Sequence, residues 1–231
     1  MKVKELSVFF PAYNEETNIK ATITKAAKIL PQITKKWEII VVDDGSTDKT
    51  GEIVEGLIKK NPQVRMITHA PNRGYGAALK SGFAASKYSW VAFTDADGQF
   101  DFSDIKKFLP FTKEADLILG YRIKRADSAL RRFYGFIWNL IAKILFGLDV
   151  KDYSCGFKLI KRKVFEEVQP LEAEEKVTQI EFLVKAKRLG FRFAEIGVGH
   201  YPRRQGKQTG ANIKVVIGSL INLFKLWRKL R

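Results

Sequence analysis

The sequence contains only one cysteine, Cys155, and two histidines among its 231 residues. A single cysteine excludes an intramolecular disulfide and a zinc site built from several cysteines, and it is typical of a protein from a reducing compartment. Cys155 has no predicted partner, so we expect a packing residue rather than a nucleophile. His69 and His200 have no metal-ligand spacing around them, and we expect neither to bind a metal.

The sequence also lacks an apolar run long enough to cross a bilayer, which takes about 20 residues. Lys143 interrupts the apolar stretch 133–148, and the stretch 215–224 ends at Lys225. Residues 1–10 lack the pattern of a cleaved signal peptide. Hydrophobic residues make up 45% of the chain and charged residues 29%, which excludes disordered and collagen-like proteins. The length suits one full-sized domain.

Acidic residues are absent after Glu195, whereas eight basic residues follow it. Residues 1–120 carry 17 basic and 15 acidic side chains, and residues 121–231 carry 24 and 10. The net charge of +16 therefore lies almost wholly in the second half. It indicates an anionic partner there: a nucleic acid, a membrane surface or a phosphorylated substrate. We find no motif that reads RNA or DNA, so we expect no nucleic-acid partner.

Residues 213–231 are expected to form a basic amphipathic helix. At about 100° per residue, one arc carries Lys214, Asn222, Lys225 and Lys229, and the other carries Ile213, Val216, Ile217, Leu220, Phe224 and Trp227. The pattern is typical of a helix that lies in a membrane interface, but a helix packed on its own domain has it too. The same two alternatives are open for residues 133–148. In a membrane interface, Arg131 and Arg132 would lie near lipid phosphates.

Strand-like and helix-like segments alternate along the chain. The expected strands are 3–10, 37–42, 65–69, 88–94, 115–119 and a segment near 191–198; the expected helices are 16–30, 47–60, 75–86, 104–113, 161–169 and 178–189. This alternation predicts an α/β fold with an open, mainly parallel sheet wrapped by helices. On helix 178–189 we expect Glu181 to be an exposed glutamate.

Three polar clusters follow predicted strands: Pro11-Ala12-Tyr13-Asn14-Glu15-Glu16, Asp43-Asp44-Gly45-Ser46 and Asp95-Ala96-Asp97-Gly98-Gln99. Ligands of open α/β sheets bind at the carboxyl ends of the strands. Clustered carboxylates repel one another unless a cation joins them, and an Asp-x-Asp pair suits Mg²⁺ or Mn²⁺ with a diphosphate completing the shell. Taken singly, each cluster is also explained as an ordinary turn.

The stretch Asn72-Arg73-Gly74-Tyr75-Gly76-Ala77-Ala78-Leu79 contains Gly-x-Gly before a helix. The third glycine of the dinucleotide fingerprint is absent, because position 79 is leucine, and the stretch does not follow the first strand. Both facts disfavour a Rossmann oxidoreductase. A nucleotidyltransferase is disfavoured because no glycine-rich, lysine-bearing phosphate loop follows the first strand.

The runs SVFFPAYNEETNI, VVDDGSTDKT, NRGYGAAL and FTDADGQFD together resemble the family-2 glycosyltransferases, which have a GT-A fold. The segments GYRIKR, DYSCGFKLIKRKVF and GFRFAEIGVGHYPRRQGKQTG resemble the branch that uses polyprenyl phosphate as acceptor, typified by dolichyl-phosphate mannose synthase. The resemblance covers about residues 5–212. It implies a glycosyltransferase domain over 1–212, with a nucleotide-sugar half (1–120) and an acceptor half (121–212), followed by the interfacial helix 213–231.

The resemblance also implies a role for particular residues. Donor-binding residues would be Pro11, Tyr13, Glu15, Val42, Asp44, Asp95, Ala96, Asp97 and Gln99; Asp95, Asp97 and Gln99 would hold Mg²⁺ or Mn²⁺. The catalytic residues would be Asp97, Arg122 and Arg203, and the acceptor phosphate would meet Arg122, Arg131, Arg203, Arg204 and Lys207. The mannose synthases usually have a lysine where this chain has Thr209, so Lys207 or Arg204 is the candidate for the missing cation.

The implied activity is inverting transfer of a hexose, mannose or glucose, from GDP-mannose or UDP-glucose to a polyprenyl or dolichyl phosphate. A lipid phosphate is charged near neutral pH, so it can attack without the general base that a hydroxyl acceptor needs. The alternative is a family-2 enzyme that uses a saccharide hydroxyl in cell-surface polysaccharide synthesis. We expect a cytoplasmic protein, peripheral on the inner face of the membrane, attached directly or through a separate membrane-anchoring partner.

Overall fold

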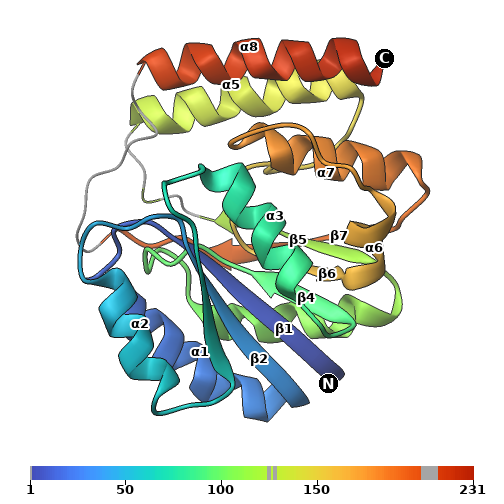
Figure 1. The fold of residues 1–231 in the computed structure, drawn as a ribbon. Helices are drawn as coiled ribbons and strands as arrows, with labels where there is room; N and C mark the ends of the chain where they lie inside the picture. The colour runs from blue at the N-terminus through green and yellow to red at the C-terminus, as the bar shows by residue number, and fades with distance from the viewer. Residues whose placement is uncertain (1, 124–125, 127–128, 204–212) are drawn as a thin grey trace.

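The computed structural model describes residues 2–123, 126, 129–203 and 213–231, with only the backbone for 130–131 and 213–217. Its centre is a seven-stranded sheet in the order β3-β2-β1-β4-β6-β5-β7, covered by helices (Figure 1). The strands are β1 (Val3–Ala12), β2 (Thr34–Asp43), β3 (Val64–Thr68), β4 (Trp90–Phe93), β5 (Leu117–Ile123), β6 (Lys158–Lys161) and β7 (Phe193–Gly199). The helices are α1 (Ile19–Ile33), α2 (Thr50–Ile58), α3 (Tyr75–Ala85), α4 (Ile105–Phe108), α5 (Ala129–Phe146), α6 (Arg162–Glu167), α7 (Val177–Arg188) and α8 (Ile213–Leu230), with 3₁₀ turns η1 (Phe102–Asp104) and η2 (Leu109–Lys113).

The predicted α/β architecture is confirmed. Strands β3, β2, β1 and β4 are mutually parallel, and β5 is parallel to β7. Only β6 runs antiparallel to its neighbours β4 and β5. The sequence did not predict β6, because Lys158 and Lys161 leave an apolar core of only two residues in this strand.

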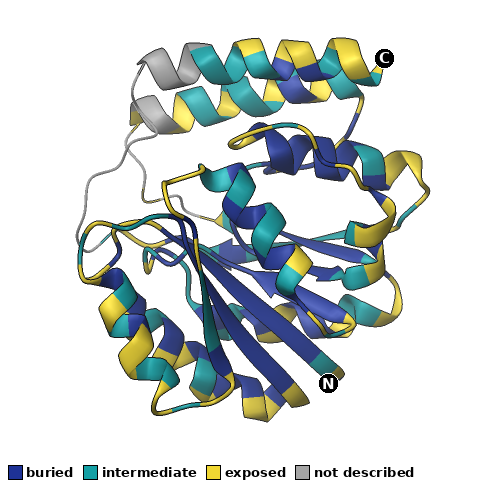
Figure 2. Ribbon diagram, in the orientation of Figure 1, coloured by how far each residue is buried: buried dark blue, intermediate teal, exposed yellow. Residues whose placement is uncertain are grey.

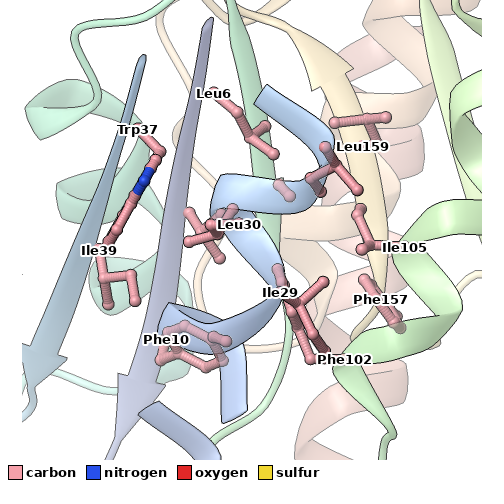
Figure 3. Packing of buried hydrophobic residues seen from close by; sticks show 14 of the residues in the cluster. Leu6, Phe10, Ile29, Leu30, Trp37, Ile39, Phe102, Ile105, Phe157 and Leu159 are labelled. Atoms are coloured by element: carbon pink, nitrogen blue, oxygen red, sulfur yellow. The ribbon is translucent and has the colours of Figure 1, made fainter. Parts of the chain in front are cut away.

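Two apolar layers fill the two faces of the sheet. In β1, Phe10 packs with Leu30 of α1 and Phe157 on one face (Figure 3), whereas the preceding Phe9 packs with Phe83 of α3 on the other. Successive residues of a strand point to opposite faces, so a strand that is apolar at every position must be covered on both sides. The fully buried run of β1 therefore follows directly from its sequence.

Helices α5 and α8 lie side by side in an outer layer beyond α3 and α7 (Figure 1). The predicted apolar arc of the last helix is described only in part, because the side chains of Ile213, Val216 and Ile217 lie outside the described residues. Among its described side chains, Leu223 and Leu226 are buried and join the cluster of α7, whereas Phe224 of the predicted arc is half exposed. The helix is thus apolar on two sides, and its own domain covers only one of them. Among the described residues, none of the helices has both the length and the apolar character to span a bilayer.

The prediction that Glu181 is exposed is also wrong. Its carboxylate is buried, accepts hydrogen bonds from the backbone N–H groups of Glu172 (2.9 Å) and Ala173 (2.7 Å), and pairs with Lys185 at 2.7 Å. Helix α7 is buried along most of its length. The acidic side chain therefore anchors the loop that precedes the helix.

The contact between α3 and β1 depends on a glycine. A Cβ on Gly82 would lie 2.3–2.6 Å from ring atoms of Phe9, whereas a Cβ on Gly56 of α2 would meet nothing within 4 Å. We expect Gly82→Ala to lower the free energy of unfolding by about 1–3 kcal/mol through overpacking. Gly56→Ala is the matched control and should raise it by up to about 1 kcal/mol through helix propensity. Urea denaturation measures both; equal effects would contradict this packing.

Candidate active site

The site lies where the order of the sheet reverses. Strand β1 pairs in parallel with β2 on one side and β4 on the other, so the loops after all three strands leave the sheet at one edge. Such a switch point is where open α/β sheets bind ligands. The three polar clusters expected from the sequence occupy these loops, and Arg203 contacts both Glu15 after β1 and Asp97 after β4.

The loops after β1 and β2 are joined by reciprocal hydrogen bonds. Asn14, which has a positive φ of 56°, donates its N–H to Ser46 Oγ (2.9 Å), and its side-chain oxygen accepts from the Thr47 N–H (2.8 Å). Pro11 of β1 lies opposite Val42 of β2. Tyr13 is half exposed beside these loops. The hydrogen bonds between the two loops therefore fix the position of the residues expected to bind the nucleoside.

Asp44 is buried and already bonded to the protein. Its carboxylate accepts from the backbone N–H groups of Arg73 (3.0 Å) and Gly74 (2.8 Å), and its Oδ1 lies 2.6 Å from Nδ1 of His69. The other ring nitrogen of His69 lies 2.9 Å from Ser81 Oγ. A base or ribose that bound Asp44 would share its carboxylate with this loop.

Asp95 and Asp97 form a pair of half-buried carboxylates after β4. Burial, and then the charge of Asp95, raise the pKa of Asp97 to about 7, although the Gln99 N–H bonds its Oδ1 at 3.0 Å. Burial also raises the pKa of Asp95, against the hydrogen bond from Tyr75 and the charge of Lys158. Burial likewise raises the pKa of Glu15. Burial is thus the first cause of all three raised pKa values, and the neighbouring hydrogen bonds and cations do not offset it fully.

This donor set fits a divalent cation. Hard ions such as Mg²⁺ and Mn²⁺ take carboxylate oxygens and keep several positions for water and phosphate. Among the described residues, no group of three or more histidine, cysteine, aspartate or glutamate side chains is arranged to hold a metal. Asp95 and Asp97 would therefore supply part of the shell, and a diphosphate would complete it. Ala96, between them, is buried, and its carbonyl accepts from Thr22 Oγ1 at 3.3 Å.

Gln99 joins this loop to the segment after β7. Its side-chain amide donates to the Tyr201 carbonyl (3.1 Å), and the Tyr201 N–H donates back to the Gln99 carbonyl (2.9 Å). Arg203, two residues further, donates to Glu15 and lies 3.9 Å from an Asp97 oxygen. The expected acceptor-phosphate residue Arg203 thus lies among the expected donor residues.

Of the other residues expected to bind the acceptor phosphate, Arg122 has a described side chain and the rest do not. Arg122 is mostly buried, and two of its guanidinium nitrogens bond the Asp152 carboxylate at 2.7 and 2.8 Å. The side chain of Arg131, at the start of α5, lies outside the described residues. Arg204, Lys207 and Thr209 lie outside them entirely, so their roles stay predictions.

Three residues of the site were missed from the sequence. Tyr75 donates its hydroxyl hydrogen to Asp95 Oδ1 at 3.0 Å, Gln179 lies 3.4 Å from the Tyr75 oxygen, and the buried Lys158 donates to Gln179. The one sequence signal was a lysine between apolar neighbours in the run GFKLI. Cys155 is buried as expected, and burial raises its pKa to about 12, so it is no nucleophile.

The sequence profile of the family described as "Glycosyl transferase family 2" matches residues 7–169. The chain belongs to this family. It is 32% identical over 213 residues to a dolichyl-phosphate beta-glucosyltransferase of Dictyostelium discoideum, covering 84% of this chain and 65% of the relative. It is 29% identical over 217 residues to an undecaprenyl-phosphate 4-deoxy-4-formamido-L-arabinose transferase of Pectobacterium carotovorum, covering 93% and 65%. The chain thus spans about two thirds of the length of these relatives.

The fold of this family-2 member matches solved structures. Glucosyl-3-phosphoglycerate synthase of Mycobacterium tuberculosis, in complex with Mn²⁺, UDP-glucose and phosphoglyceric acid, superposes with a TM-score of 0.75 at 18% identity. The match covers 97% of this chain and 80% of that one. The expected GT-A fold is confirmed.

The carboxylate pair predicts a metal response. We expect Asp97→Asn to abolish Mn²⁺ binding in the presence of UDP, because one of two charged ligands is lost while the side-chain shape is kept. Asp101→Asn is the matched control: Asp101 pairs with Lys25 and caps η1, so the variant should bind Mn²⁺ as the unaltered protein does. Electron paramagnetic resonance of free Mn²⁺ measures both, and equal affinities in the two variants would count against the site.

Proposed function

We propose that the protein transfers glucose, with inversion, from UDP-glucose to a polyprenyl phosphate at a membrane surface. The observation that carries the proposal is the half-buried pair Asp95 and Asp97 at the switch point, with Arg203 beside it. The names of the relatives, which act on dolichyl and undecaprenyl phosphates, support the acceptor. The net positive charge of the second half of the chain agrees with it.

Glucose is preferred over mannose for two reasons. Several of the similar relatives are named as dolichyl-phosphate beta-glucosyltransferases, and the fold neighbour was crystallised with UDP-glucose and Mn²⁺. Thr209 in place of the lysine of the mannose synthases agrees with this choice. GDP-mannose is therefore the comparison donor in the assay rather than the expected one.

The proposed chemistry is one displacement at the anomeric carbon. A phosphate oxygen of the acceptor forms the new bond to C1 of glucose, and the bond from C1 to the β-phosphate of UDP breaks, so UDP leaves with the electron pair. Asp95 and Asp97 would hold a divalent ion, which would supply electrostatic stabilisation of the leaving diphosphate. Arg203 orients the acceptor phosphate, and Arg122, fixed by Asp152, offsets the developing charge.

This activity is tested by incubating the protein with Mn²⁺, polyprenyl phosphate and radiolabelled UDP-glucose or GDP-mannose, followed by organic extraction. We expect label in the lipid phase from UDP-glucose only, as the β-anomer, and a loss of at least about 100-fold in Asp97→Ala because a transition-state interaction is removed. Lipid label from GDP-mannose alone would overturn the donor. UDP release that rises with a soluble saccharide, without lipid label, would favour the hydroxyl-acceptor alternative.

The proposed membrane surface is the outer face of α5 and α8. Figure 2 draws exposed residues along both helices. The large apolar side chains there are between 41% and 72% exposed: Phe133, Phe136, Leu140 and Ile144 of α5, and Ile221 and Phe224 of α8. The spacing of the α5 set keeps it on one side of the helix. Exposed Arg132, Lys225 and Arg228 suit anionic lipid headgroups.

The free, buried Cys155 agrees with a location on the cytoplasmic face of the membrane. A separate membrane-anchoring partner stays a prediction.

We expect the double substitution Phe136→Ser, Ile144→Ser to weaken binding to vesicles that contain anionic lipid by about 30-fold, because each half-exposed side chain contributes about 1 kcal/mol on insertion. Leu189→Ser is the control, since Leu189 is comparably exposed but lies at the end of α7. Sedimentation with the vesicles measures binding. A double variant that sediments like the unaltered protein would exclude α5 from the membrane surface.

A further inference from the structure

Lys158 is the unusual charged group of this fold. It lies in β6 with its side chain fully buried, between the sheet and α7. Its ammonium donates to the backbone carbonyl of Cys155 and to the side-chain oxygen of Gln179, and it lies 3.4 Å from the carbonyl of Tyr153. An ammonium donates three hydrogen bonds and cannot accept one, so each of its three hydrogens has one of these oxygens as a partner. Burying such a charge is costly, and no step of the proposed chemistry uses it directly.

The lysine sets the direction of a chain of hydrogen bonds that ends at Asp95. Because Lys158 only donates, the side-chain oxygen of Gln179 must accept from it, which turns the Gln179 NH₂ group toward Tyr75. The Tyr75 oxygen then accepts, and its single hydrogen is left for Asp95 Oδ1, 3.0 Å away. In the described part of the chain this is the one hydrogen bond to the Asp95 carboxylate, so Oδ2 accepts no hydrogen bond there.

The same lysine holds the turn on the other side of Asp95. It bonds the carbonyls of Tyr153 and Cys155, and Gly156, the next residue, lies directly against the carboxylate. A Cβ on Gly156 would fall 2.2 Å from Oδ2 and 2.7 Å from Oδ1 of Asp95. The turn thus limits the position of the carboxylate by contact, while Tyr75 fixes its rotation.

We propose that Lys158, Gln179 and Tyr75 form a positioning relay that presents Asp95 Oδ2 to the divalent ion. The inference rests on the proposed function for its biological purpose, but it concerns metal binding and is tested without sugar transfer. Residues that orient a metal ligand through hydrogen bonds typically contribute about 10–100-fold in metal affinity. Lys158 acts through its neighbours and is a positioning residue, since its hydrogens are directed away from Asp95.

The test compares the Mn²⁺ affinity of Tyr75→Phe and Lys158→Met with that of the unaltered protein, in the presence of UDP, by electron paramagnetic resonance. We expect both affinities to fall by about 10-fold or more. Lys80→Met is the matched control. Lys80 lines the same cavity as Lys158 and donates to backbone carbonyls of Leu171 and Ala173, so its loss should lower the melting temperature and leave Mn²⁺ affinity unchanged.

The outcomes separate this relay from the proposed function. Tyr75→Phe keeps the ring and its packing, so an unchanged Mn²⁺ affinity in this variant overturns the relay even if Lys158→Met fails to fold. An equal loss of affinity in Lys80→Met also overturns it, because a general loss of stability would then explain the result. Reduced Mn²⁺ affinity in both relay variants of a protein that transfers no glucose supports the relay and refutes the proposed function.

Discussion

The repulsion between Asp95 and Asp97 is the interaction on which the rest of the site depends. Burial raises the pKa of both carboxylates, and the charge of Asp95 further raises that of Asp97, so the fold must offset the charge without neutralising it. Arg203 approaches Asp97 only to 3.9 Å, and the hydrogen bond that the described residues donate to the Asp95 carboxylate comes from a neutral phenol, that of Tyr75. A direct ion pair with Lys158 would occupy the oxygens that a divalent ion needs. Placing the charge of Lys158 three hydrogen bonds away lowers the repulsion and leaves the ligand oxygens free.

Other buried acids of the chain contrast with this pair. Burial raises the pKa of Glu38, but hydrogen bonds from Ser7 and the Lys87 N–H outweigh it, so that its pKa is lowered. Glu181 is satisfied in the same way by two backbone N–H groups and a lysine. Burial alone thus does not mark a functional carboxylate. What distinguishes Asp97 is that burial and the charge of Asp95 outweigh the hydrogen bond from Gln99 and the charge of Arg203, so that its pKa is raised.

The parts of this site that follow a strand directly could be predicted from the sequence, and those assembled across the fold could not. Asp95 and Asp97 follow an apolar strand, so local pattern and the rule on strand ends were enough. The contact between Tyr75 and Gln179 joins positions 104 apart, and no local pattern reveals it. Leu223 and Leu226 illustrate the same limit: their helix is apolar on two sides, and only the position of α7 decides which side is buried.

Helix α7 connects the two regions that a polyprenyl phosphate acceptor would have to reach, the metal site and the proposed membrane surface. It packs on α3, which begins with Tyr75, and on α8 in the outer layer. Its first turn carries Gln179 of the relay, and its 12 residues span about 18 Å. A polyprenyl phosphate has a charged head that must reach the metal and an apolar tail that must stay in lipid. Since one buried helix contacts both the relay and the layer proposed to face the lipid, the height of the metal centre above a membrane would be fixed by packing rather than by a flexible linker.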